Sequence, residues 1–263
     1  MNIVVCIKQV PEVADADLDI NKEGTKIDKE DLVMGINEWD NYAVEEAVRL
    51  KEIYGGNVTV VTLGDEDSED VLRRALAMGA DEAILIDEEG FEASDATGIS
   101  RGLHRAIQDI PFDLLFTGVQ SSDDGWGQVG LILAELLSLP YASLVVGIEV
   151  EDGKAIVHRE LESNTQEKVE LPLPAVITIQ TGINDPRYVS IMGIRKVRNI
   201  EIKETEAEDL GLSEDEIGAE GSIMESTKLS LPVVGEGAEI LTGSLNEICE
   251  KTAQIIRDKG GVE

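Results

Sequence analysis

The sequence predicts an α/β fold in which helices cover both faces of a parallel, doubly wound sheet. Over the first 140 residues, short apolar segments rich in β-branched residues alternate with amphipathic segments of helical period. This alternating order favours parallel strands that are buried on both faces. Ligands of such sheets bind at the carboxyl ends of the strands, so the residues that follow each strand are the first candidates for a functional site.

The predicted elements follow one another closely. Strands are expected at 3–7, 58–63, 83–86 and 113–116, and helices at 37–54, 68–79, 94–108 and 131–137. The first helix carries Ala43, Val44, Ala47 and Val48 on one face. Gly55 and Gly56 are suited to its C-terminal end, and Ser68 is a favourable N-cap for the next helix, which Gly79 ends.

The pattern changes after Pro140. Residues 148–157 predict a β-hairpin, because Asp152 and Gly153 form a favourable two-residue turn between apolar, alternating flanks. Further strands are expected at 169–171 and 175–180. The sequence therefore predicts a β-hairpin region added to the parallel sheet.

The C-terminal part is strongly charged. A basic island at 195–198 precedes residues 201–220, which carry nine Asp or Glu and one Lys and are interpreted as a solvated linker. A segment punctuated by Gly and Pro follows at 229–241, and Ser244 is expected to cap a final helix that ends near Lys259. This end of the chain is interpreted either as an arm for a partner chain or as a helix that packs back on its own domain.

Composition excludes several classes of function. The formal net charge of −32 opposes binding to nucleic acid and to anionic membrane surfaces. No apolar run approaches the length of a membrane span, and no basic region precedes the apolar run within residues 1–8, which predicts a first strand and not a signal peptide. Cys6 and Cys249 lie far apart without a CxxC spacing, so we expect reduced thiols and a cytoplasmic location.

Residues 117–130 (TGVQSSDDGWGQVG) form the most informative segment. They lie between a predicted strand and a predicted helix and contain four glycines, Gly118, Gly125, Gly127 and Gly130. At a strand-to-helix turn, glycine lets the backbone approach an anion, and the free N–H groups of the helix start point toward it. The turn therefore favours a nucleotide phosphate as ligand, and an ordinary glycine-rich turn is the alternative.

The sequence shows no constellation suited to making or breaking bonds. Asp123 and Asp124 are adjacent carboxylates, but neighbours in a turn point apart, which favours a turn or capping role. Cys6 is expected in the core, and His104 and His158 are expected to be structural or surface residues. We therefore expect no catalytic residue and no metal site, and the residues favour a nucleotide-binding protein with a carrier or binding role.

Five segments together resemble the beta subunit of electron-transfer flavoproteins. They are 5–11 (VCIKQVP), 36–47 (INEWDNYAVEEA), 75–81 (ALAMGAD), 117–130 and 184–188 (NDPRY). The resemblance implies a nucleotide-binding α/β domain at 1–210, of the adenine-nucleotide-hydrolase-like type with an added β-hairpin region. It also implies a linker and C-terminal arm at 211–263, whose helix docks on an alpha subunit.

The resemblance implies an electron carrier made of two different subunits. Its FAD is held mainly by alpha, accepts electrons from acyl-CoA-type dehydrogenases and passes them to a quinone-linked oxidoreductase, while AMP has a structural role in beta. An electron-bifurcating member would bind a second FAD in beta and oxidise NADH, which would make the chain part of an enzyme. A nucleotide-binding regulatory module without a redox role is a third interpretation, but it explains neither the loop at 184–192 nor the arm.

Two groups of site residues follow from the resemblance. The nucleotide in beta is expected to contact Cys6, Asn37, Trp39, Asp40, Leu63, Gly118, Gln120, Ser121, Asp123, Gly127, Gln128 and Val129, with backbone N–H groups of the last three on its phosphate. Trp39 corresponds to a family position near the alpha-bound isoalloxazine. The loop at 184–192 is expected to dock on dehydrogenases through Asn184, Pro186, Arg187, Tyr188, Ile191 and Met192, with Ile191 as the apolar anchor.

The loop at 123–130 departs from both patterns of that family. Many AMP-binding members carry Asp-Asp-Asp-x-Asn-Gln-Thr-Gly, and many bifurcating members carry Asp-Gly-Asp-Thr-Ala-Gln-Val-Gly, whereas this chain has DDGWGQVG. Asp124 fits the first pattern and Val129 the second, while Trp126 either narrows the pocket or faces a partner. The DPRY segment at 185–188 favours AMP, and a second FAD stays the alternative.

Overall fold

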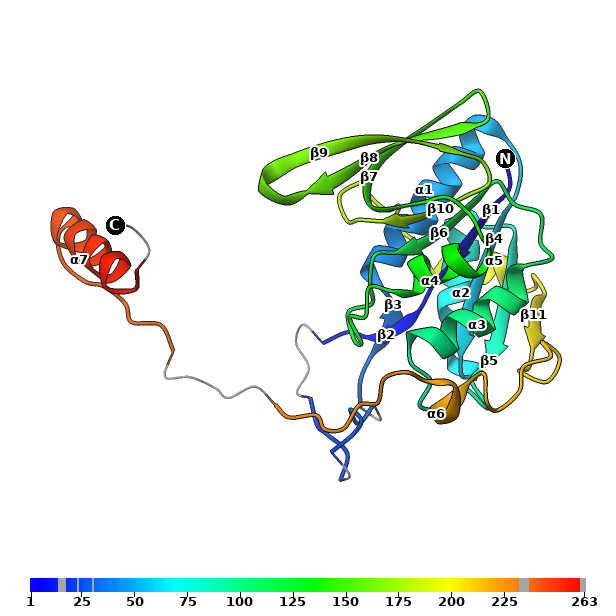
Figure 1. The fold of residues 1–263 in the computed structure, drawn as a ribbon, viewed down its shortest axis with the longest axis horizontal. Coiled ribbons are helices and arrows are strands. Elements are labelled where there is room, and N and C mark those ends of the chain that lie inside the picture. The colour runs from blue at the N-terminus through cyan, green and yellow to red at the C-terminus, as the bar shows by residue number, and fades with distance from the viewer. Residues whose placement is uncertain (14–17, 23, 30, 232–236, 261–263) are drawn as a thin grey trace.

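The computed structural model describes residues 1–13, 18–22, 24–29, 31–231 and 237–260. Within these residues, one large sheet has the strand order β11-β5-β4-β1-β6-β10-β7-β8-β9, and β2 and β3 form a separate ribbon (Figure 1). The strands are β1 (Ile3–Cys6), β2 (Gln9–Pro11), β3 (Met34–Ile36), β4 (Val58–Gly64), β5 (Glu82–Asp87), β6 (Leu114–Gly118), β7 (Tyr141–Glu151), β8 (Lys154–Leu161), β9 (Thr165–Pro172), β10 (Ala175–Ile179) and β11 (Ile202–Thr205). The helices are α1 (Glu38–Tyr54), α2 (Glu69–Met78), α3 (Ala96–Ile107), α4 (Val129–Leu136), α5 (Ile191–Val197), α6 (Gly218–Gly221) and α7 (Leu245–Asp258), with 3₁₀ turns η1 (Glu66–Ser68) and η2 (Glu162–Asn164).

The predicted doubly wound α/β class is confirmed. The neighbouring strands from β11 to β7 pair in parallel, and β8 and β9 extend the sheet in antiparallel pairs. The strands and helices predicted before residue 140 are present, with ends that differ by at most two residues. From β1 the chain runs outward through β4 and β5 and then returns to form β6 on the other side of β1.

Alternation along the central strand separates two hydrophobic cores. Ile3 and Val5 of β1 belong to the core that α1 and α2 cover, whereas Val4 and Cys6 belong to the core that α3 and α4 cover. Successive side chains of a strand point to opposite faces, so a strand covered on both faces must be mostly apolar along its length. The run of four buried residues in β1 meets this requirement.

The predicted hairpin is present between β7 and β8. Asp152 and Gly153 form its turn, and both have positive φ values, 48° and 76°, as a type I′ turn requires. β7 begins earlier than predicted, at Tyr141, and β9 adds a third strand that contains the predicted segment 169–171. β10 corresponds to the strand predicted at 175–180.

The interpretation of 201–220 as a solvated linker is wrong. β11 pairs in parallel with β5, with Ile202 beside Ala83. Ile217 is 4 % exposed and belongs to the core that α3 and α4 cover. The acidic residues concealed this structure because their charge dominates the composition, while the apolar residues between them are too irregularly spaced to predict an element.

Asp95 attaches the end of this acidic segment to α3. As the N-cap of α3, its Oδ1 accepts hydrogen bonds from the backbone N–H groups of Thr97 and Gly98. Its Oδ2 accepts from the N–H groups of Ile223 and Met224. The chain is therefore fastened to the α/β domain as far as Met224, and the division between domain and arm near residue 210 stays a prediction.

The predicted final helix corresponds to α7. Ser244 is its N-cap and forms a capping box with Glu247. None of the helix residues is buried, and α7 lies apart from the sheet (Figure 1), which favours an arm over a helix packed on its own domain. Residues 232–236 of the predicted segment 229–241 lie outside the described residues. None of the described helices is both long enough and apolar enough to cross a membrane.

The packed position of Ile217 can be tested by shortening its side chain. We expect Ile217→Ala to lower the free energy of unfolding by about 2–4 kcal/mol, because a buried isoleucine leaves a cavity. The matched control is Ile223→Ala, since Ile223 lies in the same segment and is 81 % exposed; its cost should stay within about 0.5 kcal/mol. Urea denaturation measures both values, and equal, small costs would restore the linker interpretation.

Candidate functional site

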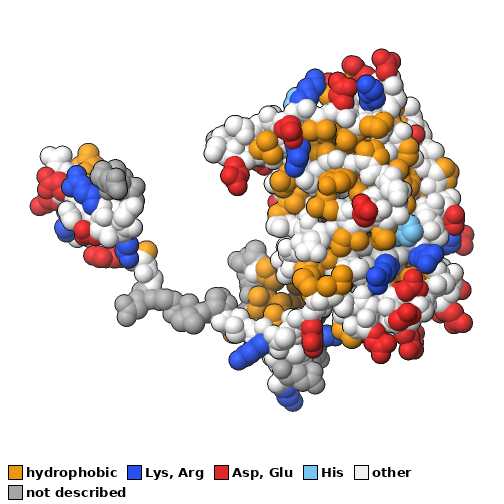
Figure 2. Space-filling model, viewed as in Figure 1, with side chains coloured by type: hydrophobic (Ala, Val, Ile, Leu, Met, Phe, Trp, Pro, Cys, Tyr) orange, Lys and Arg blue, Asp and Glu red, His pale blue; other side chains and the backbone are white. Residues whose placement is uncertain are grey.

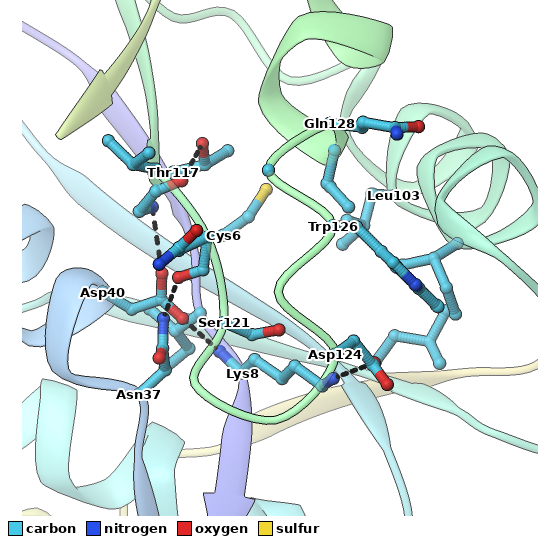
Figure 3. A pocket seen from close by; sticks show the side chains of 18 of the residues that line it. Cys6, Lys8, Asn37, Asp40, Leu103, Thr117, Ser121, Asp124, Trp126 and Gln128 are labelled. Carbon is cyan, nitrogen blue, oxygen red and sulfur yellow. Dashed lines mark hydrogen bonds and ion pairs between the residues drawn. The ribbon is translucent and has the colours of Figure 1, made fainter. Parts of the chain in front are cut away.

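A pocket lies at the carboxyl ends of β1, β4 and β6, between the start of α1, the α3 helix and the loop that leads into α4 (Figure 3). Most of the predicted cofactor-binding residues line it: Cys6, Asn37, Asp40, Leu63, Gly118, Gln120, Ser121, Gly127, Gln128 and Val129. The position agrees with the rule for doubly wound sheets, because β1 and β6 flank the point where the strand order reverses.

Asp40 joins α1 to the two central strands. Its Oδ2 accepts a hydrogen bond from the backbone N–H of Lys8 at 2.8 Å, and its Oδ1 accepts one from the N–H of Gly118 at 2.9 Å. Lys8 follows β1 and Gly118 ends β6, so one carboxylate fixes the ends of both strands. A Cβ at position 118 would overlap Asp40 Oδ1 and approach Trp39, which is why glycine is required there.

Burial shifts the pKa values of the two ionisable groups at the base of the pocket. Burial raises the pKa of Asp40 to about 7, although the N–H donors of Lys8 and Gly118 partly oppose the rise. Burial, with a smaller effect from the Asp40 charge, raises the pKa of the Cys6 thiol to about 12. Cys6 is therefore a neutral thiol at pH 7 and is not suited to act as a nucleophile.

Asn37 holds the glycine-rich loop. It is the N-cap residue of α1, but its side chain does not cap the helix. Instead, its Nδ2 donates to the carbonyl oxygen of Gln120 at 2.8 Å, and its Oδ1 accepts from the N–H of Ser122 at 3.1 Å. One side chain thus satisfies two backbone groups of the loop and fixes the loop beside the strand ends.

The loop reaches α4 through two left-handed glycines. Gly125 and Gly127 have φ values of 63° and 61°, which residues with a side chain seldom adopt. Gln128, the N-cap of α4, makes no side-chain hydrogen bond to the helix start. The N–H groups of the first turn are therefore available to an anion, as predicted for the 117–130 segment.

The wall of the pocket that β4, α3 and α4 form is apolar. Leu63 of β4, Val129 of α4 and the α3 residues Ile99 and Leu103 line it. A flat apolar ring such as a nucleobase fits such a wall beside an anion site. Ile99 and Leu103 were not among the predicted site residues, because a predicted amphipathic helix does not reveal which of its apolar residues reach a pocket.

Lys8 is a pocket residue that the site prediction omitted. Its Nζ lies 2.8 Å from Asp123 Oδ2 and 2.6 Å from Asp124 Oδ2, and 5.8 Å from the centre of the Trp126 ring. Asp123 also accepts a hydrogen bond from the N–H of Asp124. The expectation that these two carboxylates point apart is wrong, because both bind the same ammonium group. Asp124 and Trp126 line the pocket, whereas the predicted residue Asp123 lies at its edge and is not part of the lining.

Trp39 also lies outside the pocket lining. Its indole Nε1 donates to Oε1 of Gln180, just beyond β10, at 2.9 Å. Asp40 and Trp39 are consecutive, but Asp40 contacts the ends of β1 and β6 in the pocket, whereas Trp39 contacts Gln180 outside it. The predicted proximity of Trp39 to an isoalloxazine stays a prediction.

The predicted docking loop is held against α1 largely by the buried carboxylates of Glu45 and Glu46. Arg187 donates from Nε to Glu45 Oε2 at 2.8 Å, from Nη2 to Glu45 Oε1 at 3.0 Å and from Nη1 to Glu52 at 2.9 Å. These hydrogen bonds raise the pKa of Arg187 above its ordinary value. Asn184 donates to Glu46 at 3.0 Å and to the carbonyl oxygen of Tyr42 at 3.1 Å. Asn184 and Arg187 therefore anchor the loop to α1, and their contact with a partner stays a prediction.

The apolar docking residues have the opposite arrangement. Tyr188, Ile191 and Met192 are exposed, with 72 % of Ile191 accessible. Pro186, between the two anchors, is half-buried. The loop thus presents an apolar surface on a backbone that charge-assisted hydrogen bonds hold in place.

Comparison with known proteins gives consistent matches over the chain. The sequence profile of the electron transfer flavoprotein domain matches residues 25–210. The electron transfer flavoprotein subunit beta of Methylophilus methylotrophus is 36 % identical, over 99 % of this chain and 100 % of that protein. The protein of the same name from Bacillus subtilis is 35 % identical over 100 % of both chains. The caffeyl-CoA reductase-Etf complex subunit CarD of Acetobacterium woodii is 36 % identical, over 98 % of this chain and 99 % of its own.

The raised pKa of Asp40 makes stability depend on pH. Between about pH 4 and pH 7 the unfolded chain releases this proton while the folded chain retains it, so the free energy of unfolding falls as pH rises. From pH 5 to pH 7 the fall due to Asp40 should be about 2 kcal/mol.

The Asp40→Asn variant lacks the titrating carboxyl group, so it is compared with the wild type. Urea denaturation of both proteins between pH 5 and pH 8 should show the difference in free energy of unfolding, wild type minus variant, decreasing as pH rises. Contributions from other groups are common to both proteins and cancel. Parallel curves would show that Asp40 is already ionised at pH 5 in the folded protein.

Proposed function

The chain belongs to the electron transfer flavoprotein family, and we propose that it is the beta subunit of a heterodimeric electron carrier. The observation that carries this proposal is the combination, on one helix, of a ligand pocket and an anchored apolar docking loop. Asn37 and Asp40 at the start of α1 build the pocket, and Glu45, Glu46 and Glu52 further along α1 hold the loop. A carrier must bind its cofactors and also meet its redox partners.

We assign AMP to the pocket, in a structural role. The apolar wall of Leu63, Ile99 and Leu103 suits an adenine ring, and the uncapped start of α4 suits a phosphate. FAD, when bound mainly in the alpha subunit, supplies the redox chemistry of the heterodimer. The residues of this chain bind and orient, because the buried Cys6 thiol stays protonated and the charges of the pocket are engaged in hydrogen bonds and ion pairs.

The docking partners in this proposal are acyl-CoA-type dehydrogenases and a quinone-linked oxidoreductase. Ile191, Met192 and Tyr188 would enter an apolar recess of the dehydrogenase, while Arg187 keeps the loop in position. The alpha subunit would cover the arm with α7 and the face shown in Figure 2, where hydrophobic side chains are exposed between charged margins. Leu136 and Tyr141 are exposed apolar residues at the end of α4 and the start of β7. We place the complex in the cytoplasm.

An electron-bifurcating complex is the second candidate. In that case the pocket of this chain would hold a second FAD and the complex would oxidise NADH. Val129 in the loop and the 36 % identity to CarD, a subunit of a caffeyl-CoA reductase-Etf complex, favour it. The DPRY segment at 185–188 favours the AMP-binding carrier. A regulatory module without a redox role would account for neither the anchored loop nor the exposed helix α7.

Flavin reduction in the assembled complex tests the proposed function. The chain is co-expressed with its alpha subunit, and the absorbance of the flavin is followed after addition of either an acyl-CoA dehydrogenase with its substrate or NADH alone. The carrier predicts reduction by the dehydrogenase and no direct reduction by NADH. Direct reduction by NADH would favour the bifurcating complex, and a colourless complex would favour the regulatory module.

Ile191→Ala should slow electron exchange with the dehydrogenase without loss of flavin. Removing a central apolar anchor costs about 1–2 kcal/mol of association, which corresponds to a reduction of about tenfold in the second-order rate constant. Stopped-flow mixing of the variant complex with reduced dehydrogenase measures that constant. The control is Ile223→Ala, an exposed isoleucine outside the loop. If the Ile191 variant loses its flavin instead, the loop has a structural role.

A further inference from the structure

Lys8 has an unusual position among the charged residues of the pocket. Of the described residues that line the pocket, it is the only one with a cationic side chain. Its backbone is fixed at the base, because its N–H donates to Asp40 and its carbonyl oxygen accepts from the N–H of Asn37 at 2.9 Å. From this fixed backbone the side chain of Lys8 extends across the pocket toward the glycine-rich loop (Figure 3).

The ammonium group of Lys8 forms an ion triad with Asp123 and Asp124. The distances of 2.8 Å and 2.6 Å from Nζ to the two Oδ2 atoms are those of charge-assisted hydrogen bonds. Burial raises the pKa of Asp123, but the charge of Lys8 outweighs this effect and holds the pKa below its ordinary value. One positive and two negative charges leave the triad with a net negative charge.

This negative charge conflicts with an anionic ligand. A nucleoside monophosphate carries close to two negative charges at neutral pH, and the chain carries a net charge of −32. The start of α4 offers a partial positive charge of about half a unit, which does not compensate for two carboxylates. Among the described residues of the lining, Lys8 has the cationic side chain that can pair with the phosphate, provided that it leaves its carboxylate partners.

The loop places the phosphate site within reach of Lys8. Trp126, whose ring is 5.8 Å from Nζ, directly precedes Gly127, the first of the residues whose N–H groups are expected on the phosphate. Lys8, Gly127, Gln128 and Val129 all line this pocket, so the lysine side chain and the expected phosphate site share one cavity. Side-chain exposures of 37 % for Lys8 and 40 % for Asp124 show that these groups lie at the mouth, where they are free to exchange partners.

We propose that Lys8 is a phosphate-binding residue of this pocket and that Asp123 and Asp124 compete with the phosphate for it. The inference rests on the proposed function, because that function assigns a nucleotide to the pocket. A phosphorylated ligand can replace the carboxylates as the partner of Lys8, whereas an unphosphorylated nucleoside cannot. The ion triad therefore lowers the affinity for phosphorylated ligands without affecting unphosphorylated nucleosides, and Lys8 supplies the preference for a phosphate.

Binding of AMP, adenosine and inorganic phosphate to the full-length chain tests this exchange. In isothermal titration calorimetry at fixed ionic strength, Lys8→Met should weaken AMP about tenfold or more, because a hydrogen bond between charged groups is lost, and should leave adenosine unchanged. Asp124→Asn should strengthen AMP several-fold and also leave adenosine unchanged. Lys8→Arg should retain most of the preference for AMP over adenosine.

A distant ion pair supplies matched controls. Lys154 and Glu170 pair at 3.2 Å on β8 and β9, away from the pocket lining. Lys154→Met and Glu170→Gln make the same changes of charge and should leave all three ligands unaffected. Urea denaturation of each variant shows whether it is folded, and a variant that fails is replaced by Asp123→Asn, which breaks the other arm of the triad.

The outcomes separate this inference from the assignment of the pocket. If wild type binds AMP more tightly than adenosine but Asp124→Asn weakens AMP, the carboxylates hold the ligand and the competition is refuted. If Lys8→Met weakens AMP and adenosine equally, Lys8 only supports the loop. If wild type binds AMP and adenosine equally, the assignment of a nucleotide to the pocket is supported and the proposed role of Lys8 is refuted. If it binds neither, both are wrong.

Discussion

The site depends on one buried group, the carboxylate of Asp40, which accepts hydrogen bonds from two backbone N–H groups. Those N–H groups belong to Lys8 and Gly118, which lie at the ends of the two strands where the strand order reverses. Asn37, at the start of the same helix, holds the loop that continues from Gly118. Burial of a carboxylate is costly and is reflected in its pKa of about 7. The hydrogen bonds from these N–H groups offset part of that cost.

The same helix links the pocket to the docking loop. Its first turn builds the pocket, and Glu45 and Glu46, about two turns further on, anchor Arg187 and Asn184 of the loop. A rigid element that carries both features keeps a bound nucleotide and a docked partner at a fixed separation. This arrangement suits a protein whose task is to position cofactors, since distance and orientation are what a carrier contributes to electron transfer.

Much of this architecture could be predicted from the sequence because the local signals agree. The apolar segments are short, Gly55 and Gly79 follow the ends of α1 and α2, and the Asp152-Gly153 turn specifies the hairpin. The glycine-rich segment 117–130 lies where a doubly wound sheet binds ligands. The rest depended on contacts between distant residues. Lys8 is 115 residues from Asp123, and the negative charge around Ile217 concealed a buried side chain. A single sequence indicates which residues can pair but not which of them meet.

The central claim is that the pocket held together by Asp40 and Asn37 contains AMP and that the complex is a one-flavin carrier. The most direct measurement is the nucleotide content of this chain purified with its alpha subunit, determined by acid extraction and chromatography against FAD and AMP standards. We predict one FAD and one AMP per heterodimer. Two FAD and no AMP would contradict the assignment of AMP, and the absence of any adenine nucleotide would contradict the assignment of the pocket itself.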